Sequence, residues 1–223
     1  MHRFGAAAGR AILLGMTPIL YSFRRCPYAM RSRMALLVAD QAVELREIVL
    51  RDKPDSFLAA SPSASVPCLV ADDVLDESLD IMCWALGRRD PDGWLDMPDA
   101  GWDWIERADG PFKDALDRTK YAPRYPGADP VAERGKASGF LTDLNAQIAA
   151  QEEPWIFGRE TLADHAILPF VRQFAFIDKP WFDAQPWPAV QIWLERYLAS
   201  DRFQAIMPKY AKWEETTQGV AFP

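Results

Sequence analysis

Short apolar runs alternate with helix-like segments through the first part of the chain. We expect strands at 18–23, 43–50, 67–71 and 74–75, and helices or helical turns at 26–40, 54–60 and 80–86. The strand segments are short, apolar and bounded by turn residues, whereas segment 26–40 repeats apolar residues at helical spacing, as at Met30, Met34 and Leu37. This order begins with parallel crossovers and ends in a hairpin, so it predicts a mixed four-stranded sheet.

The pattern changes after a linker, Gly87-Arg-Arg-Asp-Pro-Asp-Gly93, which combines a helix stop with turn residues. Beyond it no run alternates convincingly. Helices are predicted at 100–120, 130–151, 162–177, 189–199 and 203–210. We therefore expect two domains, an α/β domain over 17–88 and an all-helical domain over 99–223.

Composition narrows the class of protein. The 223 residues are 49% hydrophobic, which is enough for a folded core, and the net charge of −7 disfavours binding to nucleic acid through phosphates. Three cysteines and two histidines provide neither a disulfide framework nor zinc-ligand spacing, so we expect a reducing compartment and no metal. No apolar run is long enough to span a membrane.

The opening residues have no place in either predicted domain. We interpret residues 1–15 as an N-terminal extension, with Met16 as the start of the protein and a transit peptide as the alternative.

Cys26 is the candidate nucleophile. It follows the first predicted strand and precedes Pro27, which suits a first helical turn. Unpaired N–H groups at a helix start and the charge of Arg25 would lower the pKa of the thiol and favour the thiolate. The residue three positions on is Ala29, so a disulfide at Cys26 needs an outside thiol to resolve it. The alternative is a cysteine that packs in the core.

Two further motifs are ambiguous when taken alone. Pro67 at the start of a strand suggests either an ordinary strand start or a cis Val66–Pro67 bond that turns the Val66 backbone toward a ligand. Ser78, preceded by Glu77, is a good helix N-cap. The same pair would also suit an amino-acid ligand, with Glu77 on its ammonium and Ser78 and the helix N–H groups on its carboxylate.

Together, Cys26, Val66-Pro67 and Glu77-Ser78 resemble the glutathione transferase superfamily over about Thr17 to Phe222. The resemblance implies a thioredoxin-like N-terminal domain followed by an all-helical domain. Segment 157–170 also resembles a helix-capping motif of this family, with Thr161 as N-cap and Asp164 answering it. His165 beside it is expected to have no catalytic role, because adjacent helix residues do not face each other.

The resemblance also implies roles for the candidate residues. Glu77 and Ser78 would hold the γ-glutamyl end of glutathione, and Val66, before Pro67, would pair with its cysteinyl backbone. Cys26 would meet its sulfur, as in the cysteine-type (omega-like, glutaredoxin-like) members, and these place a lysine, here Lys53, near the glycyl carboxylate.

The implied function is a glutathione-dependent transferase, working by thiol transfer or reductive deglutathionylation through a mixed disulfide of Cys26 with glutathione. Glutathione conjugation to electrophiles and a non-catalytic binding or regulatory protein are the alternatives. Tyr21 and Ser22 also stay open as the residue that meets the sulfur. Glutathione is expected as co-substrate, without any cofactor, together with a small hydrophobic electrophile or a disulfide as second substrate. We also expect a cytoplasmic homodimer without nucleic-acid or membrane partners.

The second substrate is less well defined by sequence. Arg24, Arg25, Arg31 and Arg33 predict a positive patch that attracts glutathione, and an ordinary solvated helix face is the alternative for Arg31 and Arg33. The aromatic residues Trp102, Trp104, Phe112 and Tyr121 are expected either in the core or along the second-substrate site. Cys68 and Cys83 are interpreted as packing residues.

Overall fold

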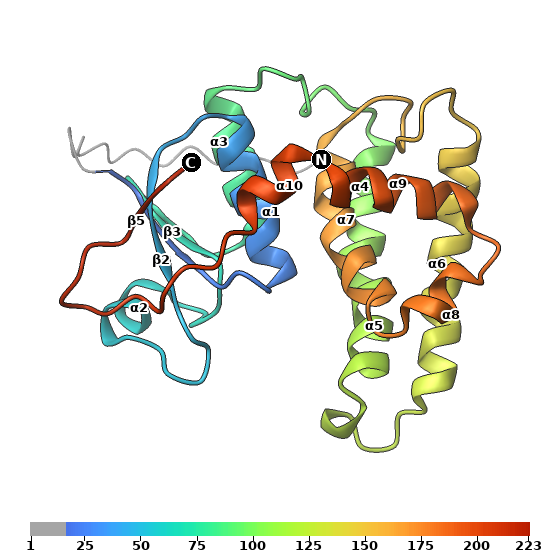
Figure 1. Ribbon diagram of the computed structural model, residues 1–223, viewed down its shortest axis with the longest axis horizontal. Coiled ribbons are helices and arrows are strands. Elements are labelled where there is room, and N and C mark those ends of the chain that lie inside the picture. The colour runs from blue at the N-terminus through green and yellow to red at the C-terminus, as the bar shows by residue number, and fades with distance from the viewer. Residues whose placement is uncertain (1–16) are drawn as a thin grey trace.

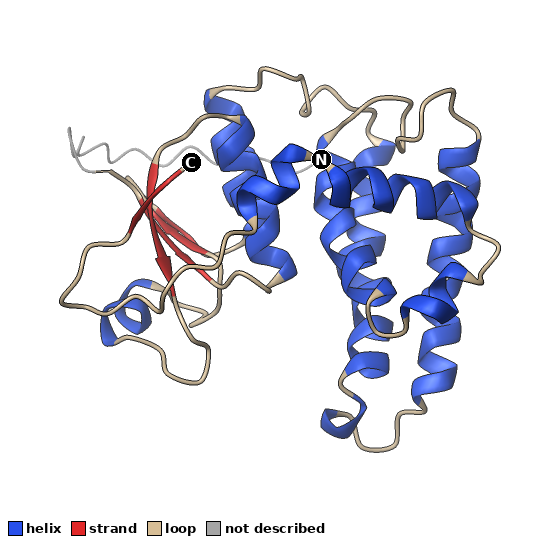
Figure 2. Ribbon diagram, viewed as in Figure 1, coloured by secondary structure: helices blue, strands red, loops and turns tan. Residues whose placement is uncertain are grey.

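The computed structural model describes residues 17–223, and the extension predicted at residues 1–15 lies outside the described residues. The first part of the chain forms an α/β unit (Figures 1 and 2). Its elements are β1 (Ile19–Ser22), α1 (Pro27–Val38), β2 (Val43–Glu47), α2 (Asp55–Ala60), β3 (Cys68–Val70), β4 (Val74–Leu75) and α3 (Ser78–Arg88). Each was predicted, with ends that differ by a few residues.

The sheet is mixed but has five strands, in the order β4-β3-β1-β2-β5. Strand β1 pairs parallel with β2 and antiparallel with β3, as expected for a crossover followed by a hairpin. The fifth strand, β5 (Val220–Phe222), comes from the far end of the chain and pairs antiparallel with β2. The predicted four-stranded sheet was wrong in this respect, because a three-residue strand is too short to show alternation.

Alternation along the strands divides the interior into two clusters. Leu20, Leu45 and Leu69 lie side by side in register and face the larger core, where α1 and α3 pack. The next residue, Tyr21, points to the other face and packs against Phe57 of α2. The period-two pattern therefore buries both faces of the sheet.

The second part of the chain is helical up to its last strand. Its elements are α4 (Ala100–Arg107), a π-helical segment η1 (Ala108–Phe112), α5 (Lys113–Lys120), a 3-10 turn η2 (Ala122–Arg124), α6 (Pro130–Ala149), α7 (Leu162–Ala175), α8 (Lys179–Asp183), α9 (Pro188–Ala199) and α10 (Asp201–Ile206). Pro111 cannot donate the usual backbone hydrogen bond, and the single predicted helix over 100–120 widens to a π turn around it. Helix α8 was not predicted, because its five residues are too few to show helical periodicity.

Helix α7 starts with the predicted capping box. Thr161 is the N-cap, and Asp164 at the third helical position answers it. The buried Asp164 carboxylate also accepts hydrogen bonds from the Ile156 backbone N–H and the Trp193 indole, at 3.0 and 2.9 Å. One side chain thereby ties the helix start to the preceding loop and to α9.

An arginine joins the two parts of the molecule. Arg31 of α1 is 1% exposed and forms a bidentate pair with Asp109 of the π turn, at 3.0 and 2.5 Å. Its Nε donates to the Ala166 carbonyl at 2.6 Å, within the turn of α7 that contains Pro169. Figure 1 shows α1, α3 and α10 between the sheet and helices α4 to α9, and Arg31 connects α1 to this helical part.

Within residues 17–223 no helix is long and apolar enough to cross a membrane. In the same part of the chain, no three His, Cys, Asp or Glu side chains are grouped so that they could hold a metal ion.

Candidate functional site

Cys26 lies where the sequence predicted it, at the turn from β1 into α1. It is the N-cap of α1, with Pro27 in the first turn, and its side chain caps no backbone group. The half-buried thiol lies 3.6 Å from the Val66 carbonyl oxygen, to which it donates a hydrogen bond. The structure thus brings together Cys26 and Val66, which are 40 positions apart in sequence.

The electrostatics of Cys26 differ from the expectation. Burial raises the pKa of the thiol above its ordinary 9.0, although backbone N–H groups of Ala29 and Tyr28 and the charges of Lys113 and Arg33 lower it. The helix start therefore acts as predicted, but the loss of solvent around the sulfur outweighs it. The prediction of a lowered pKa was therefore wrong. In the free protein Cys26 is a protonated thiol at neutral pH.

The rate of alkylation tests the raised pKa of Cys26. We expect the rate at which iodoacetamide modifies Cys26 to keep rising above pH 9, because the reactive thiolate forms only as pH approaches the raised pKa. Mass spectrometry of the Cys26 peptide measures the rate, with free glutathione alkylated in parallel as the reference thiol. A rate that levels off between pH 6 and pH 8, as for a thiol of about pKa 7, would contradict the assignment.

The loop 61–67 gathers the other predicted residues. The Val66–Pro67 bond is cis, as the functional interpretation required. Lys53 donates from its ammonium to the Ala64 carbonyl at 2.8 Å. Asp76, the residue before Glu77, accepts hydrogen bonds from the Ser61 hydroxyl and the Ser63 backbone N–H, at 2.6 and 2.7 Å. The segments of Cys26, Lys53 and Glu77 therefore all contact one loop.

The helix start at α3 differs from the prediction by one residue. Glu77 is the N-cap and Ser78 the first helical residue, so the predicted cap at Ser78 was wrong. Glu77 is exposed and has no ion pair within residues 17–223, which leaves its carboxylate available to a cation. Ser78 is buried, and its hydroxyl accepts a 3.4 Å hydrogen bond from Arg31.

The surroundings of Lys53 are more acidic than expected. A pocket between the β2–α2 connection and the C-terminal segment is lined by Asp52, Lys53, Pro54, Asp55, Lys212, Glu214 and Glu215. Lys212 pairs with both Asp52 and Glu214, at 2.6 and 3.2 Å. Of the two lysines that line this pocket, Lys53 is therefore the one available to a carboxylate ligand. The negative charges of its acidic neighbours oppose such binding.

Tyr21 and Ser22, the open alternatives to Cys26, are both occupied. The Tyr21 hydroxyl accepts a hydrogen bond from Arg46 at 2.8 Å, and the fully buried Ser22 hydroxyl accepts one from Arg33 at 2.9 Å.

The predicted positive patch contains fewer arginines than expected. Arg31 and Arg33 are buried, and their guanidinium groups pair with Asp109 and Glu47. The predicted patch was wrong for this pair, because a side chain inside the molecule cannot attract a solute. Arg24 is half-buried and Arg25 exposed, and both stay near Cys26.

Sequence analysis did not single out Lys113, whose charge acts on Cys26 from the helical part. The Lys113 ammonium lies 5.6 Å from the centre of the Tyr28 ring, and Tyr28 lies on the first turn of α1. Tyr121, after α5, accepts a 3.4 Å hydrogen bond from Gln173 of α7. Lys113 is far from Cys26 in sequence, so no spacing between the two residues could have revealed their proximity. Of the four predicted aromatic residues, Trp104 and Phe112 lie in the core, whereas Tyr121 is half-buried and Trp102 exposed.

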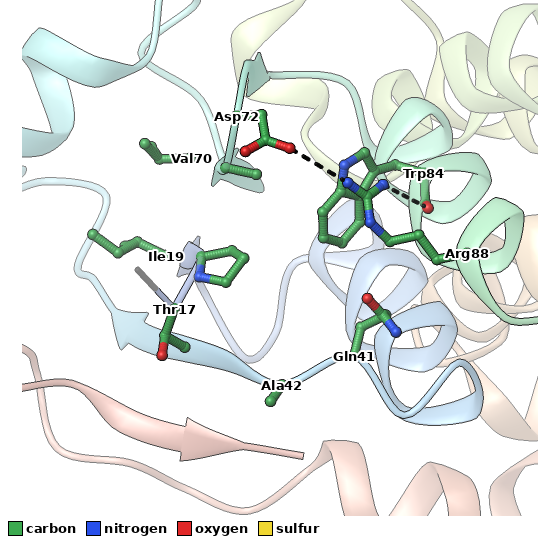
Figure 3. Close-up of a pocket in the computed structure, with 10 residues that line it drawn as sticks. Thr17, Ile19, Gln41, Ala42, Val70, Asp72, Trp84 and Arg88 are labelled. Atoms are coloured by element: carbon green, nitrogen blue, oxygen red, sulfur yellow. Dashed lines mark hydrogen bonds and ion pairs between the residues drawn. The ribbon is translucent and has the colours of Figure 1, made fainter. Parts of the chain in front are cut away.

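A separate pocket lies at the other end of β1 (Figure 3). Its lining includes Thr17 and Ile19 from the start of the sheet and Trp84 and Arg88 from the end of α3. The Arg88 guanidinium stacks on Trp84 at 3.8 Å and approaches Asp72 at 3.7 Å. None of the residues predicted for glutathione lines this pocket.

Comparison with solved structures gives the fold. A glutathione transferase family member from Pseudomonas fluorescens, crystallised with two glutathione bound, is 18% identical with a TM-score of 0.73, over 88% of this chain and 95% of that one. A glutathione S-transferase from Methylobacillus flagellatus, with GSH bound, is 18% identical with a TM-score of 0.73, over 86% and 100%. The transferase URE2P6 from Phanerochaete chrysosporium, in complex with oxidized glutathione, is 19% identical with a TM-score of 0.71, over 86% and 95%.

Comparison by sequence adds the N-terminal part. No curated protein matches the chain. Residues 20–92, which contain Cys26, Val66-Pro67 and Glu77-Ser78, match the family described as "Glutathione S-transferase, N-terminal domain". The chain therefore has the glutathione transferase fold, and its residues 20–92 match the family of glutathione S-transferase N-terminal domains.

Proposed function

We propose that this protein is a glutathione-dependent transferase that reduces glutathione mixed disulfides through Cys26. The observation that carries the proposal is the 3.6 Å contact between the Cys26 sulfur and the Val66 carbonyl. A tripeptide paired with the Val66 backbone would bring its own sulfur beside the thiol at the start of α1. The bound glutathione, glutathione pair and oxidized glutathione of the neighbouring structures support the same ligand.

The other contacts of the tripeptide follow from charge and hydrogen bonding. The exposed Glu77 carboxylate suits the ammonium of the γ-glutamyl end. The Ser78 region of α3 offers backbone N–H groups to its carboxylate. Lys53, whose ammonium donates to the Ala64 carbonyl, is the cation that would pair with the glycyl carboxylate. These assignments use every candidate residue of the N-terminal domain.

The reaction proceeds in two exchanges. The Cys26 thiol first gives its proton to water, and the thiolate attacks the glutathionyl sulfur of a mixed disulfide R–S–S–G. That S–S bond breaks, a Cys26–S–S–G bond forms, and RS⁻ leaves and takes a proton from water. A second glutathione thiolate then attacks the glutathionyl sulfur, releasing Cys26 and oxidised glutathione. The substrate is reduced to RSH and glutathione is oxidised. Because Ala29 stands where a second cysteine would resolve the intermediate, the second glutathione is required.

Conjugation of glutathione to an electrophile is the second candidate, and one observation favours it. Burial keeps Cys26 protonated in the free protein, and an S–H group can donate to a neighbouring sulfur. In that reaction the glutathione thiolate is the nucleophile and Cys26 stabilises it by a hydrogen bond. The cytoplasmic location and the homodimer that the resemblance implies stay predictions.

Labelling with oxidised glutathione tests the proposal. We expect a single glutathione adduct, on Cys26, because burial raises the pKa of Cys68 to about 12 and of Cys83 to about 11 and so suppresses their thiolates. Peptide mass spectrometry locates the adduct. Equal labelling of Cys68 or Cys83, or none on Cys26, would overturn the assignment. Calorimetry with reduced glutathione tests the alternative of a non-catalytic protein. That alternative predicts no binding of glutathione at millimolar concentrations.

A further inference from the structure

The pocket in Figure 3 contains none of the residues assigned to glutathione. It has a volume of about 240 Å³ and lies between the end of α3, the starts of β1 and β2, and the turn from β3 into β4. Helix α3 runs from Ser78 to Arg88, so the pocket and the glutathione contacts proposed at Ser78 are at opposite ends of this helix. A ligand in the pocket would therefore be additional to the tripeptide.

Apolar residues make up most of the lining, among them Pro18, Ile19, Val70 and Trp84. Ile19 and Val70 are paired in the β1–β3 ladder, and the half-buried Trp84 packs against the larger core, so the sheet and α3 hold this lining in place. The volume is below the roughly 300–1,000 Å³ of sites for drug-sized molecules. The pocket therefore suits a small molecule with a single apolar group.

Two charged side chains, Arg88 and Asp72, approach each other in this lining (Figure 3). The Arg88 guanidinium stacks on the Trp84 ring at 3.8 Å, and its Nη1 donates a 3.4 Å hydrogen bond to the Trp84 carbonyl. Its Nη2 lies 3.7 Å from the Asp72 carboxylate, which is too far for a hydrogen bond. Both side chains are exposed, so each is available to form hydrogen bonds with a ligand.

The signs of these charges select the ligand. Arg88 and Asp72 are the charged residues of the lining, one positive and one negative. Asp72 would repel a net anion and Arg88 would repel a net cation, whereas both attract a zwitterion. A ligand carboxylate accepts hydrogen bonds from a guanidinium, and a ligand ammonium donates to a carboxylate. Because the two side chains lie close together, the two charges of the ligand must also be close, as they are on the single α-carbon of an amino acid.

We propose that this pocket binds a free α-amino acid with an apolar side chain. The ligand carboxylate pairs with Arg88, the ligand ammonium pairs with Asp72, and the apolar side chain lies against Trp84 and the start of β1. These contacts replace the 3.7 Å approach of the two protein groups, an exposed pair of the kind that contributes little to stability. The inference goes beyond the proposed function, because it adds a ligand that takes no part in the reaction at Cys26.

Three compounds that share a phenyl ring and a two-carbon chain test the selection by charge. Phenylalanine is the zwitterion, 3-phenylpropionate lacks its ammonium and phenethylamine lacks its carboxylate. In NMR spectra of the ¹⁵N-labelled full chain, we expect phenylalanine to shift the Trp84 indole N–H signal with a dissociation constant on the order of 1 mM. The other two compounds should bind about two- to fivefold more weakly, the range for the loss of one exposed charge contact. The Trp84→Phe variant assigns the signal. No shift with phenylalanine, or equal affinity for all three compounds, would overturn the inference.

Substitutions then connect each preference to one side chain. In Arg88→Gln, phenylalanine should lose its advantage over phenethylamine, because its carboxylate has no cation to meet. In Asp72→Asn, it should lose its advantage over 3-phenylpropionate, because its ammonium has no anion to meet. Arg89→Gln and Asp73→Asn, at adjacent exposed positions outside the lining, are the matched controls and should keep both advantages. Advantages that persist in Arg88→Gln and Asp72→Asn would show that the charged pair does not bind the ligand, which also overturns the inference.

Glutathione is a second source of the same charges, because its γ-glutamyl end carries an ammonium and a carboxylate on one carbon. It has no apolar side chain there, so millimolar reduced glutathione should leave the affinity for phenylalanine unchanged. Competition between the two would instead make the pocket a further site for the tripeptide and overturn its assignment to an apolar amino acid. The titration involves no turnover and does not use Cys26, so its failure would leave the proposed function intact.

Discussion

Replacing Cys26 by serine should abolish reduction of hydroxyethyl disulfide, with a rate at least about a hundredfold lower than that of the unmodified protein. A hydroxyl of the same shape cannot form the mixed disulfide, whereas the contacts expected for the tripeptide come from other residues. Calorimetry should therefore show glutathione binding within about twofold of the original affinity, a difference of less than about 0.5 kcal/mol. Cys83→Ser, at a half-buried cysteine away from the site, is the matched control and should keep the rate.

The same variant separates the two candidate reactions. With chlorodinitrobenzene the nucleophile is glutathione, and a serine hydroxyl can still donate a hydrogen bond to its sulfur. If conjugation is faster than disulfide reduction in the unmodified protein and survives in Cys26→Ser, the second candidate replaces the first. Loss of glutathione binding in the variant would show that Cys26 supports the site rather than the chemistry.

Replacing Asp164 by alanine should cost about 3–5 kcal/mol of folding free energy, the scale found when one partner of a buried charged network is removed. The carboxylate accepts hydrogen bonds from Ile156, Thr161 and Trp193, and it has no access to solvent. Alanine would leave these donors buried without an acceptor. The midpoint of urea unfolding, followed by tryptophan fluorescence, measures the loss.

A second aspartate provides the control for that experiment. Asp178 is an exposed N-cap that accepts one hydrogen bond, from the Trp181 N–H of the short helix α8 at 3.1 Å. Asp178→Ala should cost about 1 kcal/mol, as for an ordinary N-cap. Equal losses at the two positions would mean that the capping box of α7 contributes no more than any helix start.

Local chemistry made much of the N-terminal domain predictable. Strands β1 to β4 show short apolar runs with turn residues between them, and Cys26 precedes a proline suited to a helix start. The capping box of α7 could also be predicted from sequence, because Thr161 and Asp164 have the spacing that this motif requires. The candidate residues for glutathione came from the resemblance, and the structure brings their segments to the loop 61–67.

What escaped prediction depends on distant parts of the chain. The raised pKa of Cys26 comes from burial that only the folded molecule produces, and it opposes the helix-start effect that the sequence does show. Arg31 and Arg33 looked like surface charges because their acidic partners, Asp109 and Glu47, lie on other elements.

Because strand β5 pairs with β2, the sheet can be completed only late in synthesis of the chain. The Gly219 backbone N–H donates to Glu44 across 175 positions, and Val43 to Leu45 pair with Val220 to Phe222. The outer edge of β2 therefore stays open on the ribosome until residues 219–222 have emerged, and it exposes unpaired backbone groups of the kind that recruit other strands. The sheet that begins with β1 is therefore completed only after helices α4 to α10 have been synthesised.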